Sequence, residues 1–486
     1  MNDKNYFLSK AQENFPQLYY RKLIPDIKSF NADTGDSVIL DLGEHAVGHF
    51  SFRFDNQDNF IDAPVRLIIK FGEDMYEIER DFATYQPGLS KTWLQEEIIN
   101  LDFPQEVTMP RRYSCRYIKI TVEFTRFPIT FSDFSFTAST SADINSLEKT
   151  ETADPLLSEI DTVATNTLRE CMQTFFEDGP KRDRRLWIGD LRLEALTNYY
   201  TFKNTEITRR CLYLFAAGDL NYLGFLPSYI YETPYFFSGR ANIADYALLY
   251  VVSVCDYYEH TGDIVVVNDL LDLCKSQLDS FEKLLDENLI VTPQDGWFAF
   301  IDWCPGLSGL TALQGVYLYT LEHFSKLLRK INDPAAEKYE SLLQDVRVAS
   351  KKYLFDEEKG LFSNYLDDHQ LSVHSQVWMI LGGAIEGEEA KKVLLTSLKD
   401  AEAKQPCTPY MRHYVTEAMF KLGISKEATE YIKKFWGGMV EKGADTFWEA
   451  YIPENPDFSP YNDRLINSLC HAWSCTPSYF IRKYNL

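Results

Sequence analysis

The pattern of hydrophobic and polar positions changes once along the chain, near residue 145. Before that point, short stretches rich in Val, Ile, Phe and Thr alternate in places between apolar and polar positions, and turn residues separate them; they span 37–43, 49–55, 64–72, 116–124 and 129–138. Period-two alternation is typical of strands with one buried face. Several such strands in succession indicate an antiparallel β-sandwich.

After about residue 150 the apolar positions recur every three to four residues, which predicts helices. We expect twelve, near 155–173, 190–203, 205–216, 242–260, 263–285, 307–330, 334–352, 370–383, 387–402, 408–422, 425–438 and 463–483. Asp154 before Pro155 marks one start and Asp333 before Pro334 another, because a capping carboxylate followed by proline suits a first helical turn. No fixed-length repeat indicates a solenoid. Twelve helices in one unit can close into six hairpins.

These patterns together predict a mainly α chain of two domains. An N-terminal antiparallel β-sandwich domain over residues 1–145 precedes an (α/α)6 six-hairpin barrel over residues 146–486.

Composition and charge narrow the possible partners. The chain has 486 residues, of which 45% are hydrophobic, and a net charge of −23. Nucleic acid and anionic membrane surfaces are disfavoured as partners, because a nucleic-acid binder needs cationic groups to displace counterions. No apolar run is long enough to span a membrane, the N-terminal segment has no apolar signal-peptide core, and the nine cysteines form no CxxC pair. We therefore expect a cytoplasmic protein.

Three loops between the predicted helices carry tryptophans next to carboxylates: 177–190, 295–306 and 444–460. An aromatic ring stacks on the apolar face of a sugar while carboxylates accept hydrogen bonds from its hydroxyls, so this pairing favours sugar binding. Other interpretations stay open for the same residues. The charges of 177–190 could form salt bridges on a solvated loop, and each tryptophan could belong to the barrel core.

The first of these loops carries a motif that resembles a known family. The run Asp178-Gly-Pro-Lys-Arg182-Asp183-Arg184-Arg-Leu-Trp187-Ile-Gly189-Asp190 is similar to the active-site motif of the inverting α-L-rhamnosidases, glycoside hydrolase family 78, which reads Asp-x-Pro-x-Arg-Asp-Glu-Arg and then Trp-x-Gly-Asp. Four further matches follow the family order: Asp41-Leu-Gly-Glu-His-Ala-Val-Gly48, Ile301-Asp302-Trp303, Thr446-Phe-Trp448-Glu449 and Ser468-Leu-Cys-His471.

The resemblance implies an (α/α)6 barrel behind a β-sandwich and a pocket that hydrolyses a glycoside with two carboxyl groups, one acting as acid and one as base. It assigns the base to Glu449. The residues that it places around the sugar are Asp178, Arg182, Trp187, Asp190, Asp302, Trp303 and His471. Without the resemblance, Glu449 could equally be a helix cap or half of a salt bridge, and His471 a buried core residue.

Two positions depart from the family pattern. The family's acid Glu falls at Arg184, which stays protonated and cannot donate a proton, and the loop is one residue shorter. Asp183 then takes the place of the acid. Its flanking arginines favour the ionised form, so Asp190 remains the alternative acid. Ile243 stands where the family often has a tryptophan, which would remove one wall of the pocket.

We therefore predict an inverting exo-glycosidase of the α-L-rhamnosidase type that takes a small carbohydrate or glycoside as substrate. No metal or organic cofactor is expected, because the eight histidines form no HxH or HExxH cluster. Two alternatives stay open: a sugar-binding protein that has lost catalysis, which Arg184 supports, and an inverting hydrolase for another sugar, which both Arg184 and Ile243 allow. Retention of Glu449 argues against a pure binder.

Overall fold

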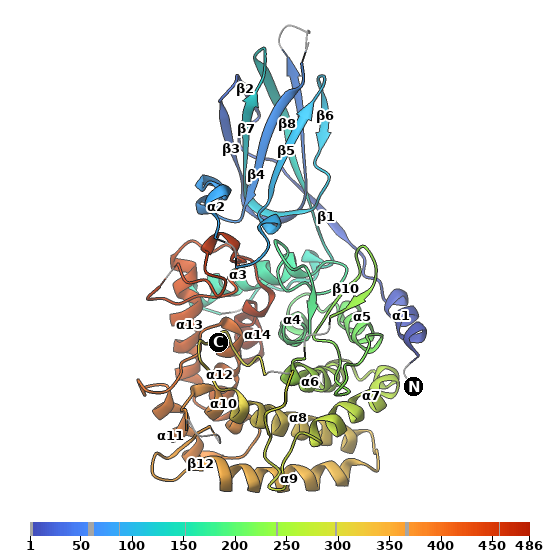
Figure 1. Cartoon of the computed structure of the whole chain (residues 1–486), viewed down its shortest axis with the longest axis vertical. Coiled ribbons are helices and arrows are strands. Elements are labelled where there is room, and N and C mark those ends of the chain that lie inside the picture. Colours follow the sequence, from blue (N-terminus) through green and yellow to red (C-terminus); the bar gives the residue numbers. More distant parts are fainter. Residues whose placement is uncertain are drawn as a thin grey trace.

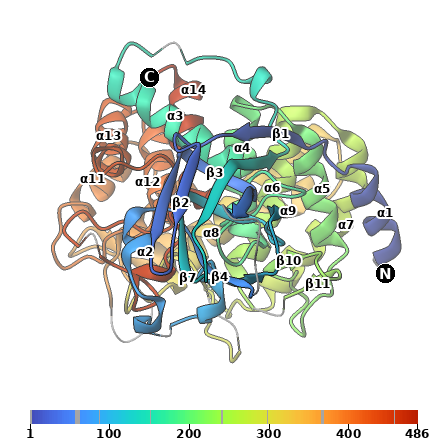
Figure 2. The ribbon, with the colours of Figure 1, turned by 90° about the horizontal axis from the view of Figure 1, so that it is seen from above.

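The computed structural model describes residues 3–56, 63–86, 88–150, 152–239, 242–296, 299–364, 369–455 and 457–486. The strands form one end of the molecule and the helices the other, stacked along its long axis (Figure 1). Viewed from above, the strands stand over the helical part, between α3 and α13 on one side and α5 and α7 on the other (Figure 2). Among the described residues, no helix is both long and apolar enough to cross a bilayer.

The N-terminal strands pair in one antiparallel sheet that folds over on itself into a sandwich. In the described part of the chain they are β1 (Tyr19–Leu23), β2 (Ser29–Ala32), β3 (Ser37–Asn56), β4 (Val65–Gly72), β5 (Glu96–Leu101), β6 (Gln105–Thr108), β7 (Tyr113–Phe124) and β8 (Ile129–Thr140). The first half of β3 pairs with β7 and the second half with β8, so β3 passes from one layer to the other. The two strands expected at 37–43 and 49–55 are thus halves of one strand, with a register shift between Asp41 and Ala46.

Alternation along these strands fills the space between the layers. Ile118, Ile120 and Val122 of β7 are fully buried against Phe131 and Phe136 of β8 in one apolar cluster. This cluster is separate from the core of the helical part, which confirms the expected change of pattern after the sandwich.

The helices alternate between an outer and an inner ring of a six-hairpin barrel. The outer ones are α3 (Pro155–Cys171), α5 (Thr205–Ala216), α7 (Ile264–Glu282), α9 (Ala336–Leu354), α11 (Gly387–Ser397) and α13 (Ser425–Glu441). The inner ones are α4 (Ile188–Tyr200), α6 (Ala244–Thr261), α8 (Leu310–Lys330), α10 (Val373–Leu381), α12 (Pro409–Lys421) and α14 (Pro477–Tyr484). Each inner helix from α4 to α12 packs against the next, and the 3-10 turn Ala472–Ser474 closes the ring between α12 and α4.

Smaller elements complete the chain. Two short helices, α1 (Lys4–Glu13) and α2 (Met75–Glu79), belong to the N-terminal part, and α1 packs on α5. The strands β9 (Leu186–Trp187), β10 (Tyr229–Tyr231) and β11 (Phe237–Ser238) form a small sheet beside the barrel, and β12 (Phe355–Asp356) pairs with β13 (Leu361–Phe362). Short 3-10 turns cover Phe82–Thr84, Lys91–Trp93, Ile144–Ser146 and Arg464–Ile466.

Local signals placed some helix starts well and others less so. Asp154 caps α3 by accepting from the backbone N–H groups of Leu156 and Leu157, as predicted. Asp333 accepts from the N–H of Ala335 at 2.8 Å, and α9 starts at the next residue, Ala336. The helix expected over 463–483 is wrong for its first half, because 463–476 is a loop with two 3-10 turns and only α14 is helical.

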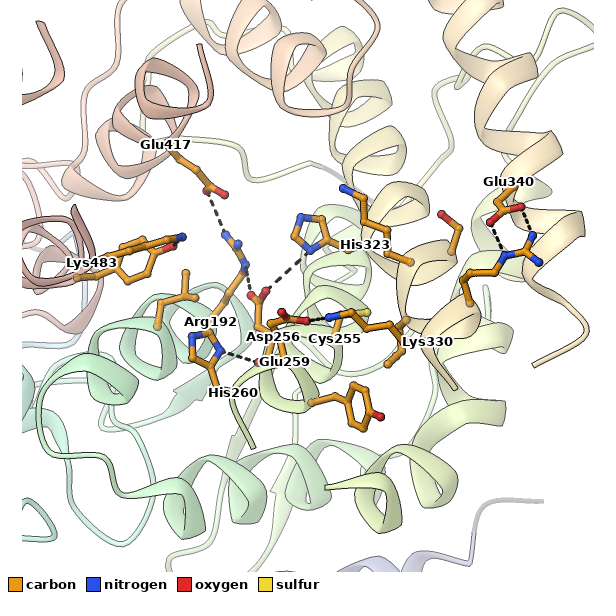
Figure 3. Close-up of a pocket in the computed structure, with 17 residues that line it drawn as sticks. Arg192, Cys255, Asp256, Glu259, His260, His323, Lys330, Glu340, Glu417 and Lys483 are labelled. Carbon is orange, nitrogen blue, oxygen red and sulfur yellow. Dashed lines mark hydrogen bonds and ion pairs between the residues drawn. The ribbon is translucent and has the colours of Figure 1, made fainter. Parts of the chain in front are cut away.

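The C-terminal ends of the inner helices surround a hollow of about 600 Å³ at the barrel end away from the start of α4. Arg192 lies buried at its floor, with Nε 3.0 Å from Asp256 and Nη2 donating to Tyr319 at 2.7 Å, and its Nη1 is 3.6 Å from Glu417 (Figure 3). At the rim, Arg329 pairs with Glu340. The buried charges thus bind three inner helices, α4, α6 and α12, to one another.

We expect Arg192→Met to destabilise the barrel by about 3–5 kcal/mol, because it would leave Asp256 buried, and Glu417 with only 19% of its side chain exposed, without their cation. The free energy of unfolding, measured in urea, checks this value. Arg329→Met is the matched control at the rim of the same hollow, where both partners are exposed, and it should unfold with the parent. Equal stability of Arg192→Met and the parent would contradict the expectation.

Candidate active site

A cavity of about 140 Å³ lies at the barrel end that faces the sandwich, where the inner helices begin. Asp190 is in the first turn of α4, and Ile243 caps α6. Loops from three distant parts of the chain complete the walls. The lining residues are Asp178, Arg182, Asp183, Trp187, Asp190, Ile243, Tyr246, Phe300, Trp303, Glu449, Tyr461, His471 and Trp473.

The loop 178–190 is held in a tight turn that carries Asp183 to the cavity. At its base, the Asp178 N–H donates to the Arg185 carbonyl, and the Asp178 carboxylate accepts from the Arg185 N–H at 3.0 Å. At its tip, Asp183 and Arg184 both take the left-handed conformation, with φ of +62° and +49°. Two successive residues in this region are uncommon outside glycine and turn the chain sharply. Leu186 and Trp187 then pair with β10.

Arg182 and Arg184 of this loop point in different directions. Arg182 reaches the cavity, where its Nη2 donates to Glu449 and its Nε to the Ile466 carbonyl at 2.8 Å. Arg184 turns toward the sandwich and donates to the carbonyls of Pro180 and Arg112 at 2.7 and 2.9 Å. Only the first of these two cations therefore lines the cavity.

Glu449 is buried and held as an acceptor on both oxygens. The Tyr461 hydroxyl donates to Oε1 at 2.5 Å, and Arg182 donates to Oε2. Burial alone would raise the pKa of Glu449, but the Arg182 guanidinium, then His471 and the hydrogen bond from Tyr461, bring that pKa below its ordinary value. Glu449 is therefore ionised at neutral pH, as a general base must be.

The carboxyls of Asp178 and Asp190 have the opposite bias. Burial raises the pKa of Asp178 well above its usual range, and the carboxyls of Asp183 and Asp190 raise it further. Burial also raises the pKa of Asp190, while the His471 ring opposes this shift. One cavity thus holds a carboxylate with a lowered pKa and two carboxyl groups with raised pKa values.

Several buried polar atoms of the cavity have no protein partner. His471 Nε2 lies 3.4 Å from Asp190 Oδ1, but neither atom makes a well-aligned hydrogen bond, and His471 Nδ1 is also unpartnered. Buried polar atoms in native proteins are nearly always bonded to something. A ligand with hydroxyl groups would satisfy these atoms.

Aromatic rings form the remaining walls. Trp187 packs on Tyr229 and Tyr246, with ring centroids 4.6 and 6.3 Å apart. Trp303 is 38% exposed and meets the edges of Phe300 and Tyr461 at 5.1 and 6.1 Å. Ile243 lines the same cavity, so the wall expected to be lost there is replaced by an aliphatic surface.

The structure brings eight of the nine predicted site residues together and leaves Asp302 out of the cavity. The Asp302 carboxylate accepts from the N–H groups of Cys407 and Thr408 at 2.8 and 3.1 Å, from the Thr408 hydroxyl at 2.5 Å, and contacts His374 at 2.8 Å. These bonds involve both oxygens and fix the start of α12, so the structure gives Asp302 a role behind the cavity wall. In the loop 295–306, Trp297 and Phe298 lie outside the described residues.

Sequence reasoning missed four lining residues: Tyr246, Phe300, Tyr461 and Trp473. Tyr461 follows the aromatic and acidic loop 444–460 by one residue, so its neighbourhood was a usable signal. Trp473 fell inside the segment that was wrongly predicted as helix. Tyr246 and Phe300 are two among 63 tyrosines and phenylalanines, counting 30 Tyr and 33 Phe, and nothing local distinguishes them.

Two family models together match almost the whole chain. Residues 17–138 match the glycosyl hydrolase family 78 α-rhamnosidase N-terminal domain, and residues 146–484 match the bacterial α-L-rhamnosidase six-hairpin glycosidase domain. The curated proteins searched gave no match.

Solved structures show the same likeness. A rhamnosidase from Klebsiella oxytoca with rhamnose bound is 36% identical, with a TM-score of 0.95 over 99% of each chain. A family 78 rhamnosidase of Bacillus sp. GL1 shares the fold at 24% identity and a TM-score of 0.78, over 94% of this chain and 47% of that one. The Streptomyces avermitilis α-L-rhamnosidase complexed with L-rhamnose does so at 17% and 0.70, over 96% of this chain and 44% of that one.

Proposed function

The chain belongs to glycoside hydrolase family 78, the α-L-rhamnosidases, and from this membership we propose that it removes terminal α-L-rhamnose from a glycoside or oligosaccharide with inversion at the anomeric carbon. It is a glycoside hydrolase of the rhamnosidase type. The choice of sugar draws on the Klebsiella oxytoca rhamnosidase, whose structure holds rhamnose.

The observation that carries the proposal is the contrast between carboxyl groups around one small cavity. Glu449 is kept ionised by Arg182 and Tyr461, whereas the loop across from it carries carboxyls with raised pKa values. Inverting hydrolysis needs an ionised carboxylate to activate water on one face of the sugar and a second carboxyl group to protonate the leaving oxygen, and Glu449 has the first of these states. The raised pKa values belong to Asp178 and Asp190, so the choice of the acid rests on position in the cavity.

In this mechanism Glu449 acts as the general base. Its ionised carboxylate takes a proton from water as the water attacks the anomeric carbon. Arg182 and Tyr461 hold the carboxylate in one orientation. The neutral Glu449 then releases this proton to solvent, and the Arg182 guanidinium favours the release because it lowers the pKa of the carboxyl group.

Asp183 is the general acid that we propose. It lines the cavity from the tip of its loop, and its carboxylate makes no hydrogen bond with another side chain of the described structure, so it is free to reach the glycosidic oxygen. Asp190 is the competing candidate, because burial raises its pKa. The rest of the proposed sugar contacts comprise Asp178, Arg182, Trp187, Asp190, Trp303 and His471, with Asp302 as a support for α12.

We also propose a domain boundary and a cellular location for this chain. We place the boundary between the two domains at residues 145 and 146, between β8 and α3. A cytoplasmic location is supported by the nine cysteines, all free thiols, including Cys171 and Cys470 whose sulfurs are 4.0 Å apart.

A screen of 4-nitrophenyl glycosides tests the function. We expect turnover of the α-L-rhamnoside well above that of the arabinoside, fucoside, glucuronide and galactoside, with the β-anomer of rhamnose as the first product by proton NMR. Preference for another sugar would overturn the choice of rhamnose. Binding of rhamnose with no hydrolysis of any substrate would show a sugar-binding protein instead.

Glu449→Gln keeps the shape of the side chain and removes its charge. We expect kcat to fall by about 10²–10⁴-fold, because general acid–base catalysis typically contributes that much. Sugar affinity, measured by calorimetry with rhamnose, should persist because the hydroxyl contacts come from other residues. Parent turnover in this variant would refute the assignment of the base.

Leaving groups distinguish the two candidate acids. Asp183→Asn should slow the phenyl rhamnoside by about 10²–10⁴-fold and the 2,4-dinitrophenyl rhamnoside far less, since only the poor leaving group needs a proton. Asp190→Asn is the matched variant from the same loop and should slow both substrates alike. The reverse pattern would make Asp190 the acid. Equal slowing of both substrates by Asp183→Asn would leave Asp183 a structural residue.

A further inference from the structure

We propose that Glu73 of the sandwich, together with Lys181, is a positioning pair for the catalytic base Glu449, so that the N-terminal domain completes the active site. This inference rests on the proposed function of Glu449. Neither residue lines the cavity. Both lie behind it, at the junction of the two domains.

Lys181 is the centre of this contact. Its side chain is 1% exposed, and its ammonium lies 3.1 Å from Glu73 and 2.6 Å from Glu77, both in the sandwich domain. It also donates to the backbone carbonyl of Asn467 in the barrel. One cation thus joins the loop 178–190, the sandwich and the loop 464–471.

Glu73 holds the second loop directly. Its Oε2 accepts from the Leu469 N–H at 2.6 Å, and its Oε1 accepts from the Ser114 hydroxyl at 3.0 Å, with His45 at 3.3 Å. Burial would raise the pKa of Glu73, but Lys181 and His45 lower it to about 2. Glu73 is therefore ionised at neutral pH and holds the loop through this bond. Burial, together with the Glu73 carboxylate, raises the pKa of the neighbouring Glu77 to about 8 although Lys181 opposes this shift.

One residue, Ser468, lies between the two positions that Lys181 and Glu73 bind, and it contacts the base. Lys181 and Glu73 bind Asn467 and Leu469, and Ser468 between them pairs with Glu449. The Glu449 N–H donates to the Ser468 carbonyl at 3.0 Å, and the Ser468 N–H points back to the Glu449 carboxylate at 3.5 Å. Lys181 and Glu73 therefore hold the backbone on either side of Ser468, while the backbone groups of Ser468 itself contact the base.

The residue next to Lys181 transmits the same constraint. Arg182 donates to the Ile466 carbonyl and to Glu449, so consecutive cations fix consecutive carbonyls of one loop, those of Ile466 and Asn467. A displacement of Lys181 would move Arg182 relative to the base. Because Arg182 lowers the pKa of Glu449, such a displacement would raise that pKa.

A small apolar cluster holds the other partner of the base. Phe82, Tyr85 and Leu94 of the sandwich domain pack with Leu465 and Ile466, and the Tyr461 ring lies against them. At Gly88, an added Cβ would come within 1.8 Å of the Tyr461 carbonyl, so the two segments approach as closely as their backbones allow.

An ionic anchor has a consequence that apolar packing would not have. Burying a charged group costs free energy that an apolar contact avoids, so Glu73 and Lys181 are a poor choice for adhesion alone. Charged hydrogen bonds to single backbone atoms do, however, fix the position of a loop such as 464–471, which has only the short 3-10 turn Arg464–Ile466. Errors of about 1 Å in such positions can cost about 10²-fold in rate.

The test compares Glu73→Gln with Glu170→Gln in the full-length protein. Glu170 is a matched control, because it is also buried at the domain junction and accepts from Arg21 and Arg169 at 2.7 Å each and from the Val47 N–H at 2.9 Å, but touches neither site loop. Hydrolysis of 4-nitrophenyl α-L-rhamnoside is measured against pH, and rates are divided by the folded fraction from circular dichroism. Lys181→Met serves as the second test variant.

For Glu73→Gln we expect kcat to fall about 10–100-fold with KM changed little, since the ground-state sugar contacts remain. The acidic limb of kcat/KM should move to higher pH, because a weaker contact between Arg182 and Glu449 raises the pKa of Glu449. Lys181→Met should do the same, and Glu170→Gln should lower the Tm while keeping kcat and the pH profile of the parent.

Suppose that folded Glu73→Gln or Lys181→Met keeps the kcat and the acidic limb of the parent while Glu449→Gln is inactive. That result would overturn the positioning role but not the assignment of the base. Equal loss of kcat in Glu170→Gln would also overturn it, since the effect would then follow general stability. Full activity of Glu449→Gln would instead overturn both the base assignment and the positioning role.

Discussion

Arg182 and Glu449 bury opposite charges against each other at the barrel end that faces the sandwich, 2% exposed on each side. A lone charge could not be buried there, so each residue requires the other. The pair joins two loops that are 267 residues apart in sequence. The walls of the cavity, the ionised state of the base and the course of the loop 464–471 all depend on this contact.

The same ion pair explains how carboxyls with opposite protonation preferences coexist in one cavity. The Arg182 guanidinium donates to Glu449 and lowers its pKa. The weaker effects of Arg182 on Asp178 and of His471 on Asp190 do not offset burial, so the pKa values of these two carboxyls stay raised. Arg184 and Arg185 are close in sequence but direct their charges elsewhere, to backbone carbonyls and to the Tyr229 ring 4.6 Å away. Direction, more than composition, therefore sets the chemistry of this loop.

Sequence reasoning succeeded where the determinant is local and failed where it is distant. Asp154 and Pro155 mark the start of α3 because a cap involves only neighbouring residues. Residues 463–476 have apolar positions at helical spacing, yet they form a loop because Glu73 and Lys181 take their backbone groups. Asp302 matches a family motif, but its carboxylate binds α12, more than 100 residues further along. Such long-range partners leave no trace in local periodicity.

Arg184 shows how one side chain can fix the course of a loop beside a cavity. The positive φ angles of Asp183 and Arg184 turn the chain sharply at the tip of the loop 178–190. The turn directs the guanidinium of Arg184 to the carbonyls of Pro180 and Arg112, where it ties the loop to the sandwich. Asp183 is thereby left on the cavity side of the tip. Arg184 thus has a structural role in this loop, and the Asp183 carboxyl lines the same cavity as Glu449.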